Sequence, residues 1–98
     1  MQGNTGIPED SPVTVSAPAV EETILRLLAG AGAGKTVGPT DVARVLHPGT
    51  EWHLVMPQVR RGAVRLALAG RLVIYRKGRP VDPNDFKGIY RLGLPRQD

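Results

Sequence analysis

Hydrophobic side chains recur at helical spacing in the first third of the chain. They lie at positions i, i+4, i+7 and i+8, the spacing of one buried helix face: Val20, Ile24, Leu27 and Leu28. This spacing predicts a helix over 19–29. Pro18 suits its first position, and Glu21 and Glu22 suit the positive end of the helix dipole. Gly30 and the glycines that follow it end the helix.

Two further helices are predicted downstream. The second covers 39–46, begins with Pro39 and ends at His47-Pro48-Gly49. The third covers 56–69 and is the clearest of the three. One face of its helical wheel holds Val59, Ala63, Leu66 and Ala67, and the opposite face holds Gln58, Arg61, Arg65 and Ala69 with Gly62 beside them. The first of these faces is expected to be buried and the second to be exposed.

Short strands alternate with these helices. Residues 36–37 are expected to form a very short strand, 72–75 a β-branched and aromatic strand, and 88–92 a second strand antiparallel to it. A loop rich in glycine and proline joins them over 77–87. This order predicts an α+β fold of the winged helix-turn-helix type, a three-helix bundle closed by a small antiparallel β-hairpin wing.

The domain organisation follows from the same pattern. Residues 19–94 are expected to form the winged-helix domain, behind a disordered N-terminal tail over 1–18 and before a short C-terminal tail over 95–98. Within the first tail, the alternation over 13–16 is compatible with a short edge strand. The first tail contains no signal-peptide pattern, and no apolar run is long enough to span a bilayer, so a cytoplasmic protein without a membrane partner is expected.

Charge is distributed unevenly along the chain. Residues 1–34 carry one base and four acids, which gives −3, and residues 35–98 carry twelve bases and five acids, which gives +7; together they make the net charge of +4. A basic folded unit favours a polyanionic partner, of which nucleic acid is the commonest. The chain has no cysteine, which excludes disulfides and thiolate metal sites.

Several spaced segments resemble the DUF3253 family of small bacterial proteins. Residues 38–46 (GPTDVARVL) are similar to a "PSEVARAL" segment of that family, and Trp52 with the segment 56–60 (MPQVR) is similar to its tryptophan and "MP-x-VR" segment. Residues 77–83 (KGRPVDP) resemble its wing, and 88–92 (GIYRL) its closing strand. The resemblance covers about residues 20–93. It implies a winged-helix-like fold and assigns no biochemical role.

One motif suggests nucleotide binding. The stretch 30–36 ends in Gly-Lys-Thr, as a phosphate-binding P-loop does, but Ala29 stands where that loop requires glycine, and the stretch follows a helix instead of a strand. We therefore expect a flexible connection and no bound nucleotide.

Basic residues of the third helix and the wing are the candidate nucleic-acid-binding set. Arginine and glutamine can pair with base edges in the major groove, and arginine and lysine can bind phosphates. The set comprises Gln58, Arg61, Arg65, Arg76, Lys77 and Arg79. It predicts a protein that binds double-stranded DNA, for example a transcriptional regulator, with the third helix in the major groove. The alternative is a non-catalytic protein-interaction or dimerisation module, which Leu54 and Leu68 would favour if they form an exposed apolar patch.

Other residues are expected to serve the scaffold. Arg60 lies at the border of the apolar face, where an ion pair with Asp41 or Glu51 is the expected arrangement. Trp52 is expected to pack between the second and third helices, with base stacking as the alternative. The two histidines and the scattered acids form no metal-ligand, acid–base or nucleophile pattern, so neither catalysis nor a cofactor is predicted.

Overall fold

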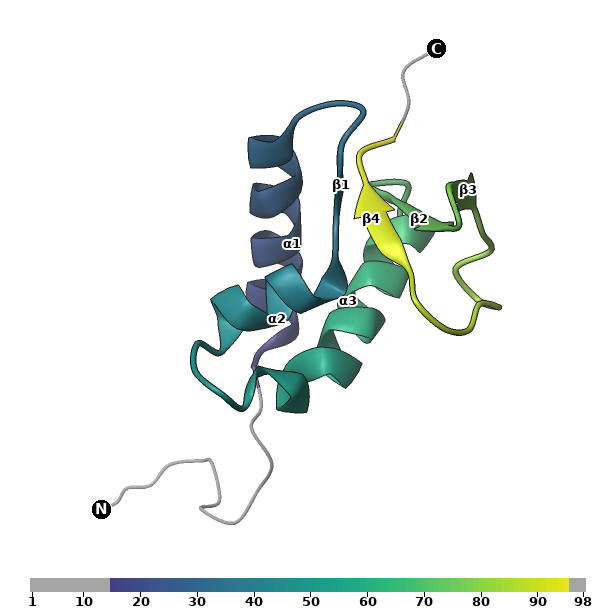
Figure 1. The fold of residues 1–98 in the computed structure, drawn as a ribbon. Helices are drawn as coiled ribbons and strands as arrows, with labels where there is room; N and C mark the ends of the chain where they lie inside the picture. Colours follow the sequence, from purple (N-terminus) through teal and green to yellow (C-terminus); the bar gives the residue numbers. More distant parts are fainter. Residues whose placement is uncertain (1–14, 96–98) are drawn as a thin grey trace, which may run out of the picture.

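Helices pack against one face of a small antiparallel sheet (Figure 1). The computed structural model describes residues 15–95, which contain three α-helices and a four-stranded sheet. The predicted α+β class is therefore confirmed, and the order of the elements is compatible with a winged helix. Most of the predicted N-terminal tail, part of the alternation over 13–16, and residues 96–98 lie outside the described residues.

The first helix, α1, spans Ala17–Ala31, so it begins two residues earlier and ends two residues later than predicted, with Gly30 inside it. Ser16 caps it, because its hydroxyl oxygen accepts a hydrogen bond from the backbone N–H of Ala19 at 3.2 Å. Pro18 therefore stands second in the helix, and Glu21 and Glu22 fall beyond the first turn, where the helix dipole favours them less. Gly32 ends α1 with a φ of 92°, a left-handed conformation that favours glycine.

The second and third helices lie close to their predicted bounds. α2 spans Pro39–Leu46, as predicted, and its start is fixed by the carboxylate of Asp41, which accepts from the N–H of Gly38 at 3.1 Å. A short 3₁₀ helix, Trp52–Val55, then leads into α3, which spans Met56–Leu68. Sequence periodicity did not predict the 3₁₀ turn, because three residues per turn over so short a run leave no periodic signal.

The sheet has the order β1-β4-β2-β3, with β1 at Thr36–Val37, β2 at Val73–Arg76, β3 at Arg79–Pro80 and β4 at Arg91–Gly93. Every neighbouring pair is antiparallel. The predicted strands at 72–75 and 88–92 are thus present but shifted towards the C-terminus. The predicted wing loop contains β3, because Lys77 and Gly78 both have positive φ (52° and 79°) and make a two-residue hairpin turn.

One hydrophobic core joins the sheet to the helices. The inward-facing residues Val37, Ile74 and Leu92 come from three different strands and belong to the same buried cluster as the helical side chains. The helices contribute Val20, Ile24, Leu28, Val42, Ala43, Val59, Ala63 and Leu66 to this cluster. Because side chains alternate across a strand, Thr36, Tyr75 and Arg91 point to the outer face, away from the helices.

Candidate nucleic-acid interface

The face of α3 that was expected to be exposed is partly covered by α1. Gly62 is buried, and a Cβ built on it would lie 2.7 Å from Cγ1 of Val20. Arg65 donates from Nε to Oε2 of Glu21 at 2.6 Å, an ion pair between α3 and α1. An acid of α1 therefore balances part of the positive charge on this face, and Gly62 is buried against α1 although this face was expected to be exposed.

Gln58 is also engaged by the chain itself. Its Oε1 accepts a hydrogen bond from the backbone N–H of Val15 at 2.8 Å, and the side chain is partly buried. Reading a base edge requires both ends of the amide, so binding DNA through Gln58 would require this bond to break. Of the three candidates on α3, only Arg61 is exposed and, within residues 15–95, outside any ion pair.

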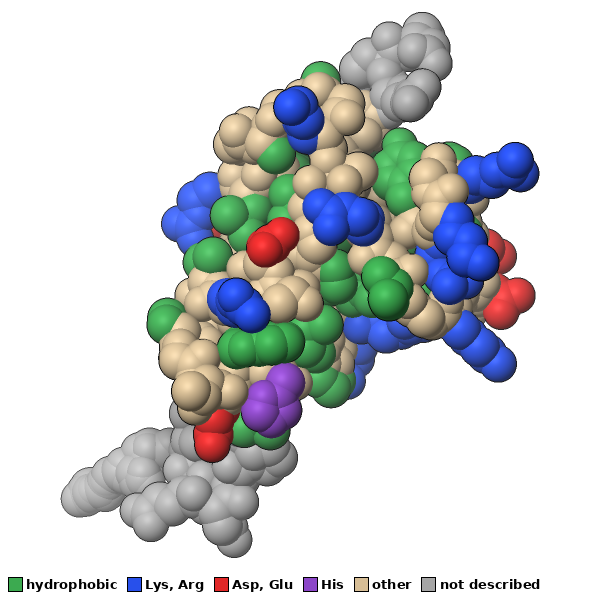
Figure 2. Space-filling view, in the orientation of Figure 1, with side chains coloured by type: hydrophobic (Ala, Val, Ile, Leu, Met, Phe, Trp, Pro, Cys, Tyr) green, Lys and Arg blue, Asp and Glu red, His purple; other side chains and the backbone are tan. Residues whose placement is uncertain are grey.

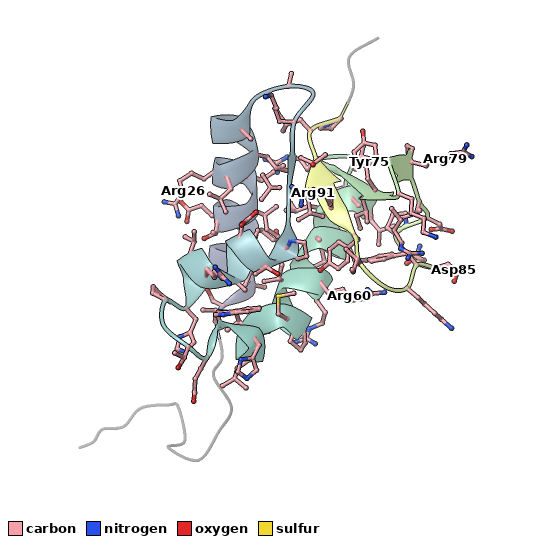
Figure 3. All side chains as sticks on the ribbon, in the orientation of Figure 1. Arg26, Arg60, Tyr75, Arg79, Asp85 and Arg91 are labelled. Carbon is pink, nitrogen blue, oxygen red and sulfur yellow. The ribbon has the colours of Figure 1, made fainter. Side chains whose placement is uncertain are left out.

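The wing presents its predicted cations unequally. Arg76 is half-buried and donates from Nε to the carbonyl oxygen of Ile89 at 3.0 Å, so it braces the base of the wing. Lys77 and Arg79 are exposed, as is Lys87 farther along the loop. Figure 3 shows Arg79 at the edge of the molecule that lies farthest from α1. These cations share the wing with Asp82 and Asp85, whose charges offset part of the positive potential.

Arg60 holds the wing loop against α3. Its Nη2 donates to the carbonyl oxygen of Phe86 at 2.6 Å, and its guanidinium lies 3.8 Å from the centroid of the Phe86 ring and 5.8 Å from that of Tyr90. The two rings meet edge to face at 5.1 Å. A scaffold role was predicted, but the predicted ion pair with Asp41 or Glu51 is wrong, because Asp41 caps α2 and the wing supplies the partners of Arg60.

Burial in this cluster raises the pKa of Tyr90 to about 12, against a smaller opposing effect of the nearby charge of Arg60. The unfolded phenol has a pKa of about 10, so the native state binds the proton more tightly. Stability is expected to fall as pH rises from about 10 through 12, because ionisation then favours the unfolded chain. Urea unfolding of the native protein and of Tyr90→Phe at pH 9, 10 and 11 measures this effect. The variant should lose less stability over this range, and equal losses would contradict the prediction.

The structure also gives the surroundings of the stretch 30–36 and of Trp52. The stretch 30–36 joins the end of α1 to β1, so it lacks the strand-to-helix setting of a P-loop. Trp52 is half-buried against the core, with the guanidinium of Arg44 on α2 at 5.1 Å from its ring centroid.

Within the described part of the chain, no helix is long and apolar enough to cross a membrane, and no three His, Asp or Glu residues gather at a metal site.

Sequence reasoning missed the outer face of the sheet. Thr36 lies opposite Gly93, and Tyr75 opposite Arg91, so these side chains share that face. The available signal was the period-two alternation of each strand, since Val37, Ile74 and Leu92 are the apolar residues between them. Strands of two to four residues carry too little of this alternation for the face to be assigned.

The fold and site together define a small basic α+β protein with a wing anchored on its third helix. The chain matches the family model described as "Protein of unknown function (DUF3253)" over residues 17–95, and it therefore belongs to that family. No curated protein matches the chain.

Proposed function

We propose that this protein is a winged-helix DNA-binding protein without enzymatic activity that holds the duplex mainly through its phosphates. The observation that carries the proposal is a set of exposed cations that make no ion pair within residues 15–95: Arg61 on α3, with Lys77, Arg79 and Lys87 on the wing. Phosphate contacts supply most non-specific affinity for DNA and do not depend on base sequence.

The engagement of Gln58 and Arg65 shapes this proposal. Both side chains already bond to other residues of the protein, so fewer side chains of α3 are available to contact base edges than the sequence suggested. Binding is therefore expected to be tolerant of sequence, with Arg61 as the remaining candidate for a base contact from α3. Such a protein would act in the cytoplasm on duplex DNA, and a role in transcription would require specificity from further contacts.

The alternative, a protein-docking patch on α3, has less support. Leu54 and Leu68 are 38% and 58% exposed, as the alternative requires. Leu54 precedes α3 and Leu68 is its last residue, so roughly 18 Å of helix separates them at about 1.5 Å per residue. The exposed surface between them carries Arg61, which interrupts an apolar patch.

Salt dependence of binding tests the proposal. Fluorescence anisotropy of a labelled duplex of about 20 base pairs, titrated at several salt concentrations, should give an affinity that falls linearly with salt on logarithmic axes. Changing Arg61, Arg79 or Lys87 to Gln should weaken binding and reduce the slope by about 1 for each phosphate that the variant no longer neutralises.

The matched control is Arg26→Gln. Arg26 is exposed on α1, on the other side of the molecule from Arg79 (Figure 3), and its replacement makes the same change in net charge. It should leave the slope unchanged. Equal effects of Arg26→Gln and the wing variants, or no binding at low salt, would overturn the proposal.

A further inference from the structure

A groove with a volume of about 710 Å³ lies on the outer face of the sheet. Its walls come from the α1–β1 loop, the β2–β3 turn, β4 and the residues that follow β4. This volume falls within the range of about 300–1,000 Å³ that is typical of small-molecule sites. The strand β4 forms the centre of this face, and Figure 1 shows it in front of α3, on the side away from the helix. The groove is thus separate from the core and from the covered face of α3.

Gly93 contributes to the depth of the groove. This residue lies on the outer face of β4, where a Cβ would come within 2.9 Å of Cε2 of Tyr75 and 3.6 Å of Cγ2 of Thr36. Glycine therefore lets the ring of Tyr75 lie close over the strand. The ring forms part of the groove lining, and Leu94 and Pro95 add apolar surface at one end.

The groove is also cationic. Lys35, Lys77 and Arg91 line it, and none of the described residues that line it is acidic. Figure 2 shows basic side chains over this face of the molecule as well as on the wing. Such a lining favours an anion, since a neutral or cationic ligand would leave the three positive charges uncompensated.

The guanidinium of Arg91 is held in place before any ligand arrives. Nε donates to Oγ1 of Thr36 at 2.7 Å, and Nη2 donates to the carbonyl oxygen of Thr36 at 3.2 Å. These bonds use two of the five N–H donors of the side chain, so further donors stay available to an anion. A fixed side chain loses little entropy on binding.

An apolar surface beside the cations favours a ligand that also has an apolar or aromatic part. Ile89 is 87% exposed at the groove, a large solvent-exposed area for an isoleucine. With the ring of Tyr75, it offers a surface against which a flat heterocycle can pack. An inorganic anion would contact the cations but would leave this surface and most of the volume unfilled.

We propose that the groove binds a small organic anion of the nucleoside monophosphate class, with its phosphate at Lys35, Lys77 and Arg91 and its base against Tyr75 and Ile89. This site shares Lys77 with the proposed DNA-binding surface, but Lys35 and Arg91 line only the groove. The protein would then bind a soluble nucleotide at the outer face of its sheet. This proposal revises the expectation from the sequence, which considered the stretch 30–36 only as a P-loop and not as one wall of a groove.

Titration of the full chain with AMP, followed by backbone NMR shifts and calorimetry, tests the inference. AMP should shift amides of the groove, including Gly78 and Gly93, and should bind more tightly than either inorganic phosphate or adenosine. If inorganic phosphate binds as tightly as AMP, the apolar surface does not contribute to binding. If adenosine binds as tightly as AMP, the cations do not contribute. Either result, or shifts confined to the wing loop around Lys87, would overturn the proposal.

Matched variants separate this site from the DNA-binding surface. Lys35 and Lys87 are both exposed, but only Lys35 lines the groove. Lys35→Gln should weaken AMP binding about threefold or more and leave DNA binding unchanged, whereas Lys87→Gln should have the opposite pattern. Gly93→Ala should also weaken AMP binding by moving the ring of Tyr75. If Lys35→Gln has no effect on AMP affinity, the groove proposal fails, whatever the result with DNA.

Discussion

Replacement of Gly62 by valine is expected to lower the free energy of unfolding by about 2–3 kcal/mol. The added Cβ would meet Cγ1 of Val20 at 2.7 Å and Cδ1 of Ile24 at 3.5 Å, and both of these side chains are fully buried. Neither can move aside without disturbing the core, so α1 and α3 must separate. For a domain of this size, the melting temperature should fall by roughly 10–20 °C, which circular dichroism can measure.

Two further variants test the cause of this destabilisation. In the double variant Gly62→Ala/Val20→Ala, the smaller side chain on α1 should relieve the clash, so the double mutant should be more stable than the sum of the single changes predicts. Gly30→Ala is the matched control, because nothing lies within 4 Å of a Cβ at that exposed helical position. It should stabilise the protein by about 0.5–1 kcal/mol. An unchanged melting temperature in Gly62→Val would contradict the close packing of α1 on α3.

Removal of the Arg60 guanidinium is expected to have the second-largest effect, about 2 kcal/mol. Arg60→Met keeps a long apolar side chain but leaves the carbonyl oxygen of Phe86 without its donor at 2.6 Å and removes the cation from the ring at 3.8 Å. The wing loop should then detach from α3 more readily. Urea unfolding, followed by the fluorescence of Trp52, measures the global decrease in stability, and trypsin cleavage after the exposed Lys87 should accelerate.

The choice of substitute distinguishes charge from geometry at this position. Arg60→Lys should recover less than half of the lost stability, because an ammonium lacks the planar group that both stacks on Phe86 and bonds its carbonyl. Arg71→Met, at an exposed arginine in the turn after α3, should have little effect on either measurement. A wing equally resistant to trypsin in Arg60→Met and in the native protein would show that another interaction anchors it.

Local signals in the sequence predicted the helices better than they predicted their surroundings. Both ends of α2 were predicted correctly. Pro39 at its start and the His-Pro-Gly sequence after its end are local helix start and stop signals, which depend only on residues within one turn. The start of α1 was predicted two residues late. Pro18 was assigned to the first helical position, but Ser16 is the N-cap, so Ala17 is the first helical residue. The last strand was predicted three residues early, since its extent depends on pairing with β1 and β2, which are distant in sequence.

The candidate site was harder to predict for a related reason. A helical wheel separates apolar from polar positions, but it does not show which neighbour covers a face that is small and polar. A small residue such as Gly62 on the polar side of a helix is equally compatible with exposure to solvent and with close packing of a neighbouring helix. Likewise, Arg65 and its partner Glu21 are 44 residues apart, so no local pattern connects them. The exposure of Arg61, Arg65, Lys77 and Arg79 was predicted correctly from the sequence, but the ion pair of Arg65 was not.

The positions of the two ends of the described chain have a practical consequence for experiments. Figure 1 places the start of α1 and the end of β4 at opposite ends of the molecule. Leu94 and Pro95, the last described residues, line the groove, so an affinity tag or a surface linker fused after them begins at its rim. A tag fused before Val15 begins beside α2 and α3, away from both the groove and the wing. Immobilisation for binding studies is therefore better made through the N-terminal side, since attachment at the other end would obstruct the site to be measured.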